Sequence, residues 1–277
     1  MITAEPATQV ARPNSRRRRA RAILVNYAPA ATVVVLLIAF WEVICRVLHV
    51  QSYLWPEPSV IARGFWNDSG LLATATWITV REVVYGFGLA VVAGLGIGIA
   101  LHVSKTLRRA LYPILIASQS VPTVVLAPVL VILMGFSIWP KLAIIALFTF
   151  FPLVVNTVDG LASVDPEYIR MMLTLDASRW SIFRRVEFPA ALPLIFSGAR
   201  IGATYAAIGA VFGEWSGSSG GLGYQMQQAQ GQLETPLVFE AVLLVTGIAV
   251  ILFVIVSVTE RLVIPWARTG VSADANA

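Results

Sequence analysis

The chain has little charge, few potential metal ligands and almost no cysteine. Of its 277 residues 57% are hydrophobic and 13% are charged, whereas a soluble domain carries about 25% charged residues. Lipid must therefore cover much of the surface. The single cysteine, Cys45, excludes a disulfide framework within the chain. The two histidines, His49 and His102, are far apart at the ends of apolar runs, so we expect no metal site.

The sequence also lacks the motifs of an enzyme that hydrolyses nucleotides. No glycine-rich loop ending in Lys-Ser or Lys-Thr is present, so any ATP must be hydrolysed by another subunit. No nucleophile–base pair or pair of acids recurs at one depth of the apolar runs. We expect no catalytic residue and no cofactor. The net charge of +5 does not indicate a nucleic-acid partner, because the arginines lie in short segments between apolar runs, as membrane topology requires.

Apolar runs of membrane-spanning length dominate the chain. A transmembrane helix needs about 20 apolar residues, and six runs approach or exceed that length: 30–50, 79–103, 111–134, 142–158, 192–212 and 237–258. We therefore expect an all-α membrane protein with six transmembrane helices. The first run is too long for a signal peptide, and its Trp41, Glu42 and Arg46 do not suit one. Residues 60–66 predict a short interfacial helix.

The proline and charge patterns divide the chain and orient it. Three prolines, Pro113, Pro122 and Pro128, interrupt the third run, which we expect to be kinked or broken. With the N-terminus inside, outer segments hold only Arg63 and Lys141 as cations, so both termini should be cytoplasmic. The predicted parts are a basic tail (1–22), a first helix with its outer loop (23–76), a core (77–268) with a cytoplasmic loop at 162–190, and a C-terminal tail (269–277).

The cytoplasmic loop reads as two short amphipathic helices. The first should begin at Pro166 after an Asp165 cap and present Ile169, Met172 and Leu173 on one face. The second should be capped by Asp176 and ended by Pro189, with an apolar face made by Trp180, Phe183 and Val186. Such a pair either lies on lipid headgroups or docks onto a cytoplasmic protein.

This loop resembles the signature of ABC-importer permeases, which is Glu-Ala-Ala, three residues, Gly, nine residues and Ile-x-Leu-Pro. Asp176 stands at the Gly position and could still close the turn, because Asp tolerates left-handed backbone. Val186, Phe188 and Pro189 match the last element, whereas residues 170–172, Arg-Met-Met, replace Glu-Ala-Ala. Further ordered matches, at 119–122, 128, 135, 151–152, 198–201 and 220–224, extend the resemblance from about 79 to 268. The permeases it resembles belong to importers of sulfonate, taurine, nitrate and thiamine-pyrimidine precursors.

The resemblance implies a type I ABC-importer permease fold in the bacterial inner membrane. Its implied partners are an ATP-binding cassette ATPase subunit, an extracytoplasmic solute-binding protein, a second copy of the chain and the lipid bilayer. The permease itself would not be an enzyme. The loop would couple it to the ATPase through Arg170, Met172, Leu175, Asp176, Ala177, Ser178, Trp180 and Phe183.

Polar residues inside apolar runs are costly and often functional. Pro122 should free a carbonyl near Ser118, and this carbonyl should face a pathway or the bundle interior and not lipid. The residues expected to line a solute pathway are Gln119, Ser120, Pro122, Thr123, Asn156, Tyr205, Glu214, Trp215 and Gln225. Two alternatives stay open: Asn156 could bond a neighbouring helix, and 214–232 could be a solvated outer loop that contacts the binding protein.

Other polar and small residues have simpler interpretations. Gly94 and Gly98 form a face for close helix packing. Arg200 should pair with Asp159 or Glu187, or point into the bundle interior. Glu42 and Glu82 are expected at the membrane interface.

The glutamines of 225–232, beside Tyr224, favour a pyrimidine or other heteroaromatic vitamin precursor as the solute. The first alternative is an importer of a sulfonate, taurine or nitrate-type anion. The second is an ion-coupled secondary transporter, but that class needs a carboxylate within the membrane. No such carboxylate is evident in the middle of a predicted span.

Overall fold

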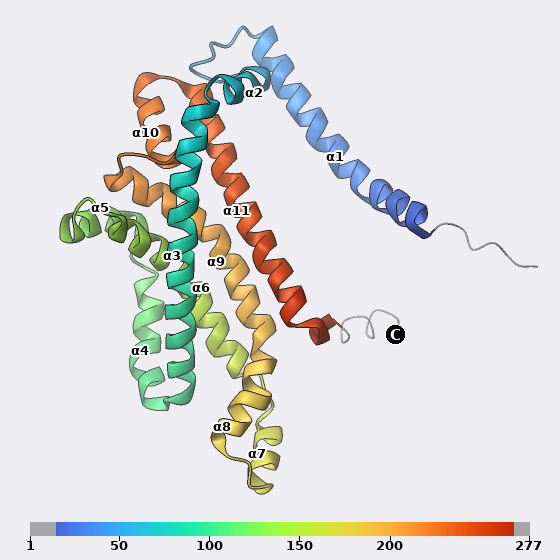
Figure 1. Ribbon diagram of the computed structural model, residues 1–277, viewed down its shortest axis with the longest axis vertical. Coiled ribbons are helices and arrows are strands. Elements are labelled where there is room, and N and C mark those ends of the chain that lie inside the picture. Colours follow the sequence, from blue (N-terminus) through green and yellow to red (C-terminus); the bar gives the residue numbers. More distant parts are fainter. Residues whose placement is uncertain (1–14, 269–277) are drawn as a thin grey trace, which may run out of the picture. The chain divides into compact units, whose positions relative to one another are not determined.

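The computed structural model describes residues 15–268, which contain helices and no strand (Figure 1). This confirms the all-α fold class. The predicted tail at 269–277 and residues 1–14 of the basic tail lie outside the described residues, as do the side chains of the arginine-rich run 16–21.

Six predicted spans correspond to helices. Four helices are each long and apolar enough to cross a membrane: α3 (Ser69–Val103), α6 (Ile138–Leu161), α9 (Phe188–Gly217, continuing a helix that begins at Arg179) and α11 (Thr235–Val263). The third run is broken as predicted, into α4 (Lys105–Ser118) and α5 (Thr123–Met134), which are bent by 101°. The first run, 30–50, overlaps α1 (Ser15–Val47) and extends three residues beyond its end.

The chain forms two compact units, residues 1–60 and 61–277. In the first unit, α1 ends near a polar cluster in which the Glu42 carboxylate accepts a hydrogen bond from the backbone N–H of Ser59, at 3.0 Å, and pairs with Arg46 at 2.5 Å. The helix α2 (Pro58–Asn67) follows and matches the short interfacial helix predicted at 60–66.

Helix α6 is the centre of the second unit and packs against α3 on one side and α9 on the other. Glycines allow the close approach. A Cβ at Gly94 would lie 2.8 Å from Leu153 Cβ, and one at Gly98 would lie 2.7 Å from Thr157 Cβ. Gly198 of α9 is equally close to the backbone of α6. The predicted packing face at Gly94 and Gly98 is therefore confirmed.

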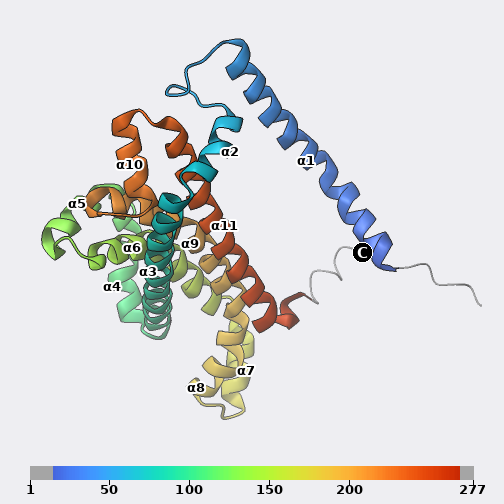
Figure 2. The same ribbon diagram turned by 45° about the horizontal axis from the view of Figure 1, so that its top comes forward.

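The two ends of the second unit carry different short helices. Helices α7 (Pro166–Thr174) and α8 (Arg179–Ile182) lie at one end, while α5 and α10 (Leu222–Gln232) lie toward the other (Figures 1 and 2). Helix α8 continues through a π-helical turn, Phe183–Glu187, into α9. The expectation that Pro189 ends this helix is wrong, because Pro189 stands in the first turn of α9, where its missing N–H is tolerated.

Candidate functional site

A cavity of about 480 Å³ lies where the α4–α5 break meets α6 and α9. Gln119 and Thr123 reach it from the break, Asn156 from α6 and Tyr205 from α9. The remaining lining residues are apolar: Leu147, Phe148, Phe151, Pro152, Val155 and Ile201. The ten described lining residues include three aromatic rings and no charged side chain, so the cavity suits a neutral ring with a few hydrogen-bonding groups.

A tight turn shapes the break. The N–H groups of Gln119 and Ser120 donate to the carbonyls of Ile116 and Ala117, at 3.1 and 3.0 Å, and Val121 N–H donates to Ser118 O at 3.2 Å. The expectation of a freed carbonyl near Ser118 is therefore wrong. Pro122 has no N–H to donate to the carbonyl of Ser118. The N–H of Val121, three residues after Ser118, donates to that carbonyl instead.

Asn156 has a partner within its own helix. Its Nδ2 donates to the carbonyl of Pro152 at 2.8 Å, and its side chain also lines the cavity. Tyr205 is 44% exposed in the single chain. Of the residues expected along the pathway, Gln119, Thr123, Asn156 and Tyr205 are brought together. Ser120 and Pro122 belong to the same turn without lining the cavity, and Glu214, Trp215 and Gln225 lie elsewhere.

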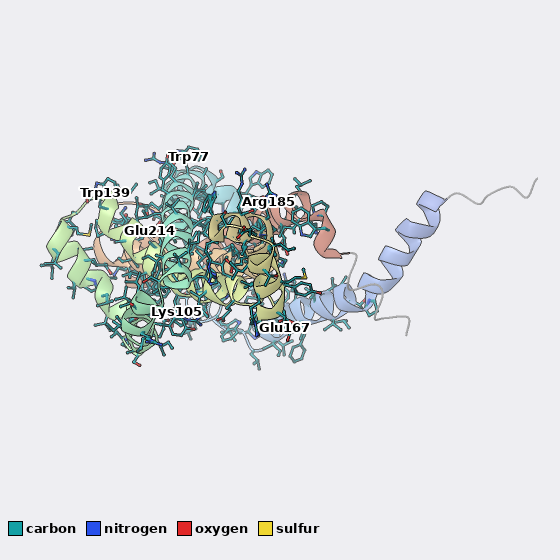
Figure 3. All side chains as sticks on the ribbon, turned by 90° about the horizontal axis from the view of Figure 1, so that it is seen from below. Trp77, Lys105, Trp139, Glu167, Arg185 and Glu214 are labelled. Carbon is teal, nitrogen blue, oxygen red and sulfur yellow. The ribbon has the colours of Figure 1, made fainter. Side chains whose placement is uncertain are left out.

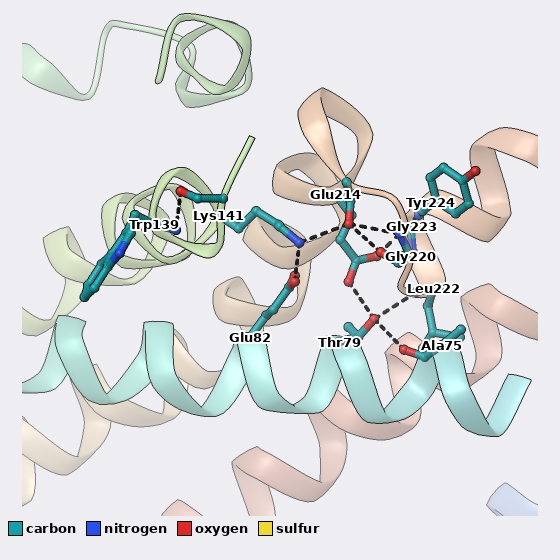
Figure 4. Close-up of polar contacts among 12 residues, drawn as sticks. Ala75, Thr79, Glu82, Trp139, Lys141, Glu214, Gly220, Leu222, Gly223 and Tyr224 are labelled. Atoms are coloured by element: carbon teal, nitrogen blue, oxygen red, sulfur yellow. Dashed lines mark hydrogen bonds and ion pairs between the residues drawn. The ribbon is translucent and has the colours of Figure 1, made fainter. Parts of the chain in front are cut away.

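A buried ion pair joins α3 to the start of α6. Lys141 Nζ lies 2.5 Å from Glu82 Oε1 and 3.0 Å from Ser218 Oγ (Figure 4). Glu82 was expected near the lipid-facing end of its span, but its side chain is 3% exposed and faces Lys141 within the bundle, and not lipid. The signal missed in the sequence is a carboxylate inside an apolar run.

The neighbouring carboxylate of Glu214 organises the backbone that follows α9 (Figure 4). Its Oε2 accepts hydrogen bonds from the N–H groups of Gly223 at 2.5 Å and Tyr224 at 3.3 Å. Thr79 of α3 donates to Oε1 at 2.6 Å and accepts from Leu222 N–H at 2.9 Å. Glu214 is 1% exposed, and Figure 3 shows it among the helices.

The network corrects one sequence interpretation. Residues 214–232 are not a plain outer loop: Glu214 belongs to α9, and Leu222–Gln232 form α10. Three carboxylates, those of Glu82, Glu214 and Glu240, are buried in long helices, but Glu214 and Glu240 lie near helix ends and Glu82 pairs with the start of α6.

The two short helices at the other end form an exposed element, which we call the docking element (residues 166–187). Asp165 caps α7 as predicted, accepting from Glu167 N–H at 2.8 Å. Trp180 is 67% exposed and stacks on Phe183, with ring centroids 5.6 Å apart. Leu175 is 74% exposed.

The turn between these helices differs in one detail from the expectation. Asp176 adopts φ 61° and closes the turn in left-handed backbone, as expected. It does not cap the second helix, because Ser178 Oγ takes that position and accepts from Ser181 N–H at 3.2 Å. Ala177 and Met172 are half-buried, while Arg170 is exposed.

Arg200 has a different partner from those expected. Its guanidinium pairs with the Glu260 carboxylate of α11, and not with Asp159 or Glu187. Glu187 instead lies 3.2 Å from His102 Nε2.

Comparison with known proteins identifies the family of this chain. The profile of the family described as binding-protein-dependent transport system inner membrane component matches residues 90–268. The chain belongs to this family. It is a multi-pass ABC transporter permease, as the resemblance of the loop implies.

Two similar proteins that match over most of the chain support this family assignment. The chain is 34% identical over 234 residues to the formylaminopyrimidine transport permease protein ThiX of Halalkalibacterium halodurans, and the match covers 84% of this chain and 93% of that protein. It is 36% identical over 233 residues to the riboflavin transport system permease protein RibX of Chloroflexus aurantiacus, covering 83% and 87%.

The fold of the permease has a solved counterpart. An inward-facing structure of the MetNI methionine ABC transporter matches with a TM-score of 0.54 and 21% identity, covering 69% of this chain and 96% of that one. The predicted type I ABC-importer permease fold is confirmed.

Proposed function

We propose that this permease carries a small, uncharged heteroaromatic solute of the pyrimidine vitamin-precursor class across the bacterial inner membrane. The cavity beside the α4–α5 break carries the proposal. Its aromatic walls offer stacking surfaces, and Gln119, Thr123 and Tyr205 offer hydrogen-bonding groups without a charge. The path through the membrane would include this cavity.

The relatives support the same solute class. The solutes for which ThiX and RibX are named, formylaminopyrimidine and riboflavin, are both aromatic heterocycles. A sulfonate, taurine or nitrate would need a cation in the path. Arg200 does not line the cavity and is already paired with Glu260, which favours the neutral solute.

The energy source in this proposal is a separate ATPase. Two copies of the permease would bind two ATPase subunits through the docking element, and an extracytoplasmic binding protein would deliver the solute. The exposed Trp180 and Leu175 support the first contact, because large exposed apolar side chains gathered on one element mark protein interfaces. Both termini would be cytoplasmic.

Reconstitution tests the proposal. The permease is placed in proteoliposomes with its ATPase and binding protein, and uptake of labelled formylaminopyrimidine is followed beside that of taurine. We expect uptake of the pyrimidine that requires ATP and persists when ionophores remove all ion gradients. Preferred uptake of taurine would establish the anion alternative. Uptake without ATP that collapses with the ion gradient would establish a secondary transporter.

A further inference from the structure

A second cavity, of about 520 Å³, lies between the end of the span α3 and the C-terminal half of the docking element, residues 179–187. We call it the basic pocket. It shares no lining residue with the solute cavity. Its polar lining comes from three elements: His102 at the end of α3, Lys105 at the start of α4, and Arg179 and Glu187 from the docking element.

The basic pocket has an excess of positive charge. Its one carboxylate, Glu187, lies 3.2 Å from His102 Nε2. Lys105 and Arg179 form no ion pair with any carboxylate among residues 15–268. Lys105 is also the first residue of the 14-residue helix α4, whose N-terminal end favours an anion. Two unpaired cations across one cavity match an anion with several oxygens, such as a phosphate group.

The rest of the lining is apolar and lies at the end of the candidate membrane span α3. Val103, the last residue of α3, is 71% exposed, and Ile182 and Phe183 complete the wall. A soluble anion would gain nothing from an apolar wall beside the two cations. A phospholipid would gain from it, because its phosphate is joined to a glycerol and apolar acyl chains. Basic pockets beside transmembrane helices are known to hold anionic headgroups.

We propose that the basic pocket binds the phosphate headgroup of an anionic phospholipid. The phosphate would lie between Lys105 and Arg179, and the glycerol region would lie against Val103. Because these residues come from the end of α3 and from the docking element, the bound lipid would tie the docking element to the membrane-spanning core. The proposed solute transport does not depend on this site.

Lipid retention tests the proposal directly. The full permease is purified in nanodiscs containing phosphatidylglycerol and phosphatidylcholine, and lipids retained after transfer to detergent are measured by native mass spectrometry. The test variant is Lys105→Gln with Arg179→Gln. The matched control is Arg184→Gln with Arg185→Gln, which removes the same charge from exposed positions of the docking element outside the pocket.

We expect the wild type and the control variant to retain phosphatidylglycerol in preference to phosphatidylcholine. The test variant should bind phosphatidylglycerol roughly 25-fold more weakly, at about fivefold for each lost cation. Equal retention by both variants, or equal loss in both, would overturn the proposal. Competition by inorganic phosphate as strong as that by phosphatidylglycerol would make the occupant a soluble anion and overturn it too.

ATPase co-purification separates this result from the proposed function. A test variant that keeps its lipid but loses the ATPase would show that the basic pocket is a protein contact, and the lipid proposal would be wrong. A variant that loses the lipid while solute uptake stays ATP-dependent supports the lipid site and leaves the transport proposal intact.

Discussion

Lys141 Nζ lies 2.5 Å from Glu82 Oε1 in a part of the bundle where the two side chains are 11% and 3% exposed. The pair joins residues 59 positions apart in the chain. Lys141 also donates to Ser218, which follows α9, so one ammonium group links three segments. An unpaired charge in a buried site destabilises the fold, so each of these two side chains needs the other as its counter-ion.

Loss of one member of this pair should destabilise the permease strongly. We expect Lys141→Met to lower the free energy of unfolding by about 3–5 kcal/mol, because Glu82 is left buried and unpaired. The double variant Glu82→Leu with Lys141→Met should recover most of this loss. Reversible unfolding in mixed micelles measures both. Additive losses in the double variant would mean that the pair has no coupling energy.

A methyl group at Gly94 should disturb the α3–α6 contact. We expect Gly94→Ala to cost about 1–3 kcal/mol, because the added Cβ would lie 2.8 Å from Leu153 Cβ. Gly96→Ala is the matched control on the same helix. Its Cβ meets nothing within 4 Å, so the higher helix propensity of Ala should leave it neutral or more stable. The same unfolding assay compares them, and equal effects would contradict close packing at Gly94.

The stacked pair Trp180 and Phe183 should anchor the ATPase. We expect Trp180→Ala with Phe183→Ala to leave the permease inserted in the membrane and to abolish solute-stimulated ATP hydrolysis. Each lost interface anchor should weaken ATPase binding by about 2 kcal/mol, or roughly 30-fold.

Trp139→Ala is the control for this pair. Trp139 is 61% exposed at the opposite end of α6, and Figure 3 shows it at the outer edge of the helices. Normal coupling in the double variant, or the same loss in Trp139→Ala, would refute the assignment.

Cysteines beside the α4–α5 break should be reachable from water. In a Cys45→Ser background we expect Gln119→Cys, Thr123→Cys and Tyr205→Cys to react with a small water-soluble thiol reagent, because the thiolate forms in water and not in lipid. Added solute should slow the reaction several-fold.

Two positions calibrate the labelling. Gln230→Cys on the exposed face of α10 should react at all times, and Ala203→Cys, at a position that is fully buried, should not react. If the three test positions behave like Ala203→Cys in every nucleotide state, the cavity is closed packing and the pathway runs elsewhere.

The span pattern, the broken third run and the two loop helices were all predictable from the sequence. Each depends on neighbouring residues: an apolar run of sufficient length, the missing N–H of Pro122, and the Asp165 cap before Pro166. The left-handed turn at Asp176 was predictable for the same reason, although its neighbour Ser178 took the capping position.

Only the tertiary structure decided which polar groups meet. Thr79 donates a hydrogen bond to Glu214, 135 residues later in the chain. Arg200 pairs with Glu260, 60 residues later. These pairings depend on which helices lie side by side and on their relative register, which the glycine contacts of α6 with α3 and α9 establish. A carboxylate such as Glu82 looks alike in sequence whether it faces headgroups or a buried lysine. The position of Lys141 in space decides between them, and no local pattern of residues contains that position.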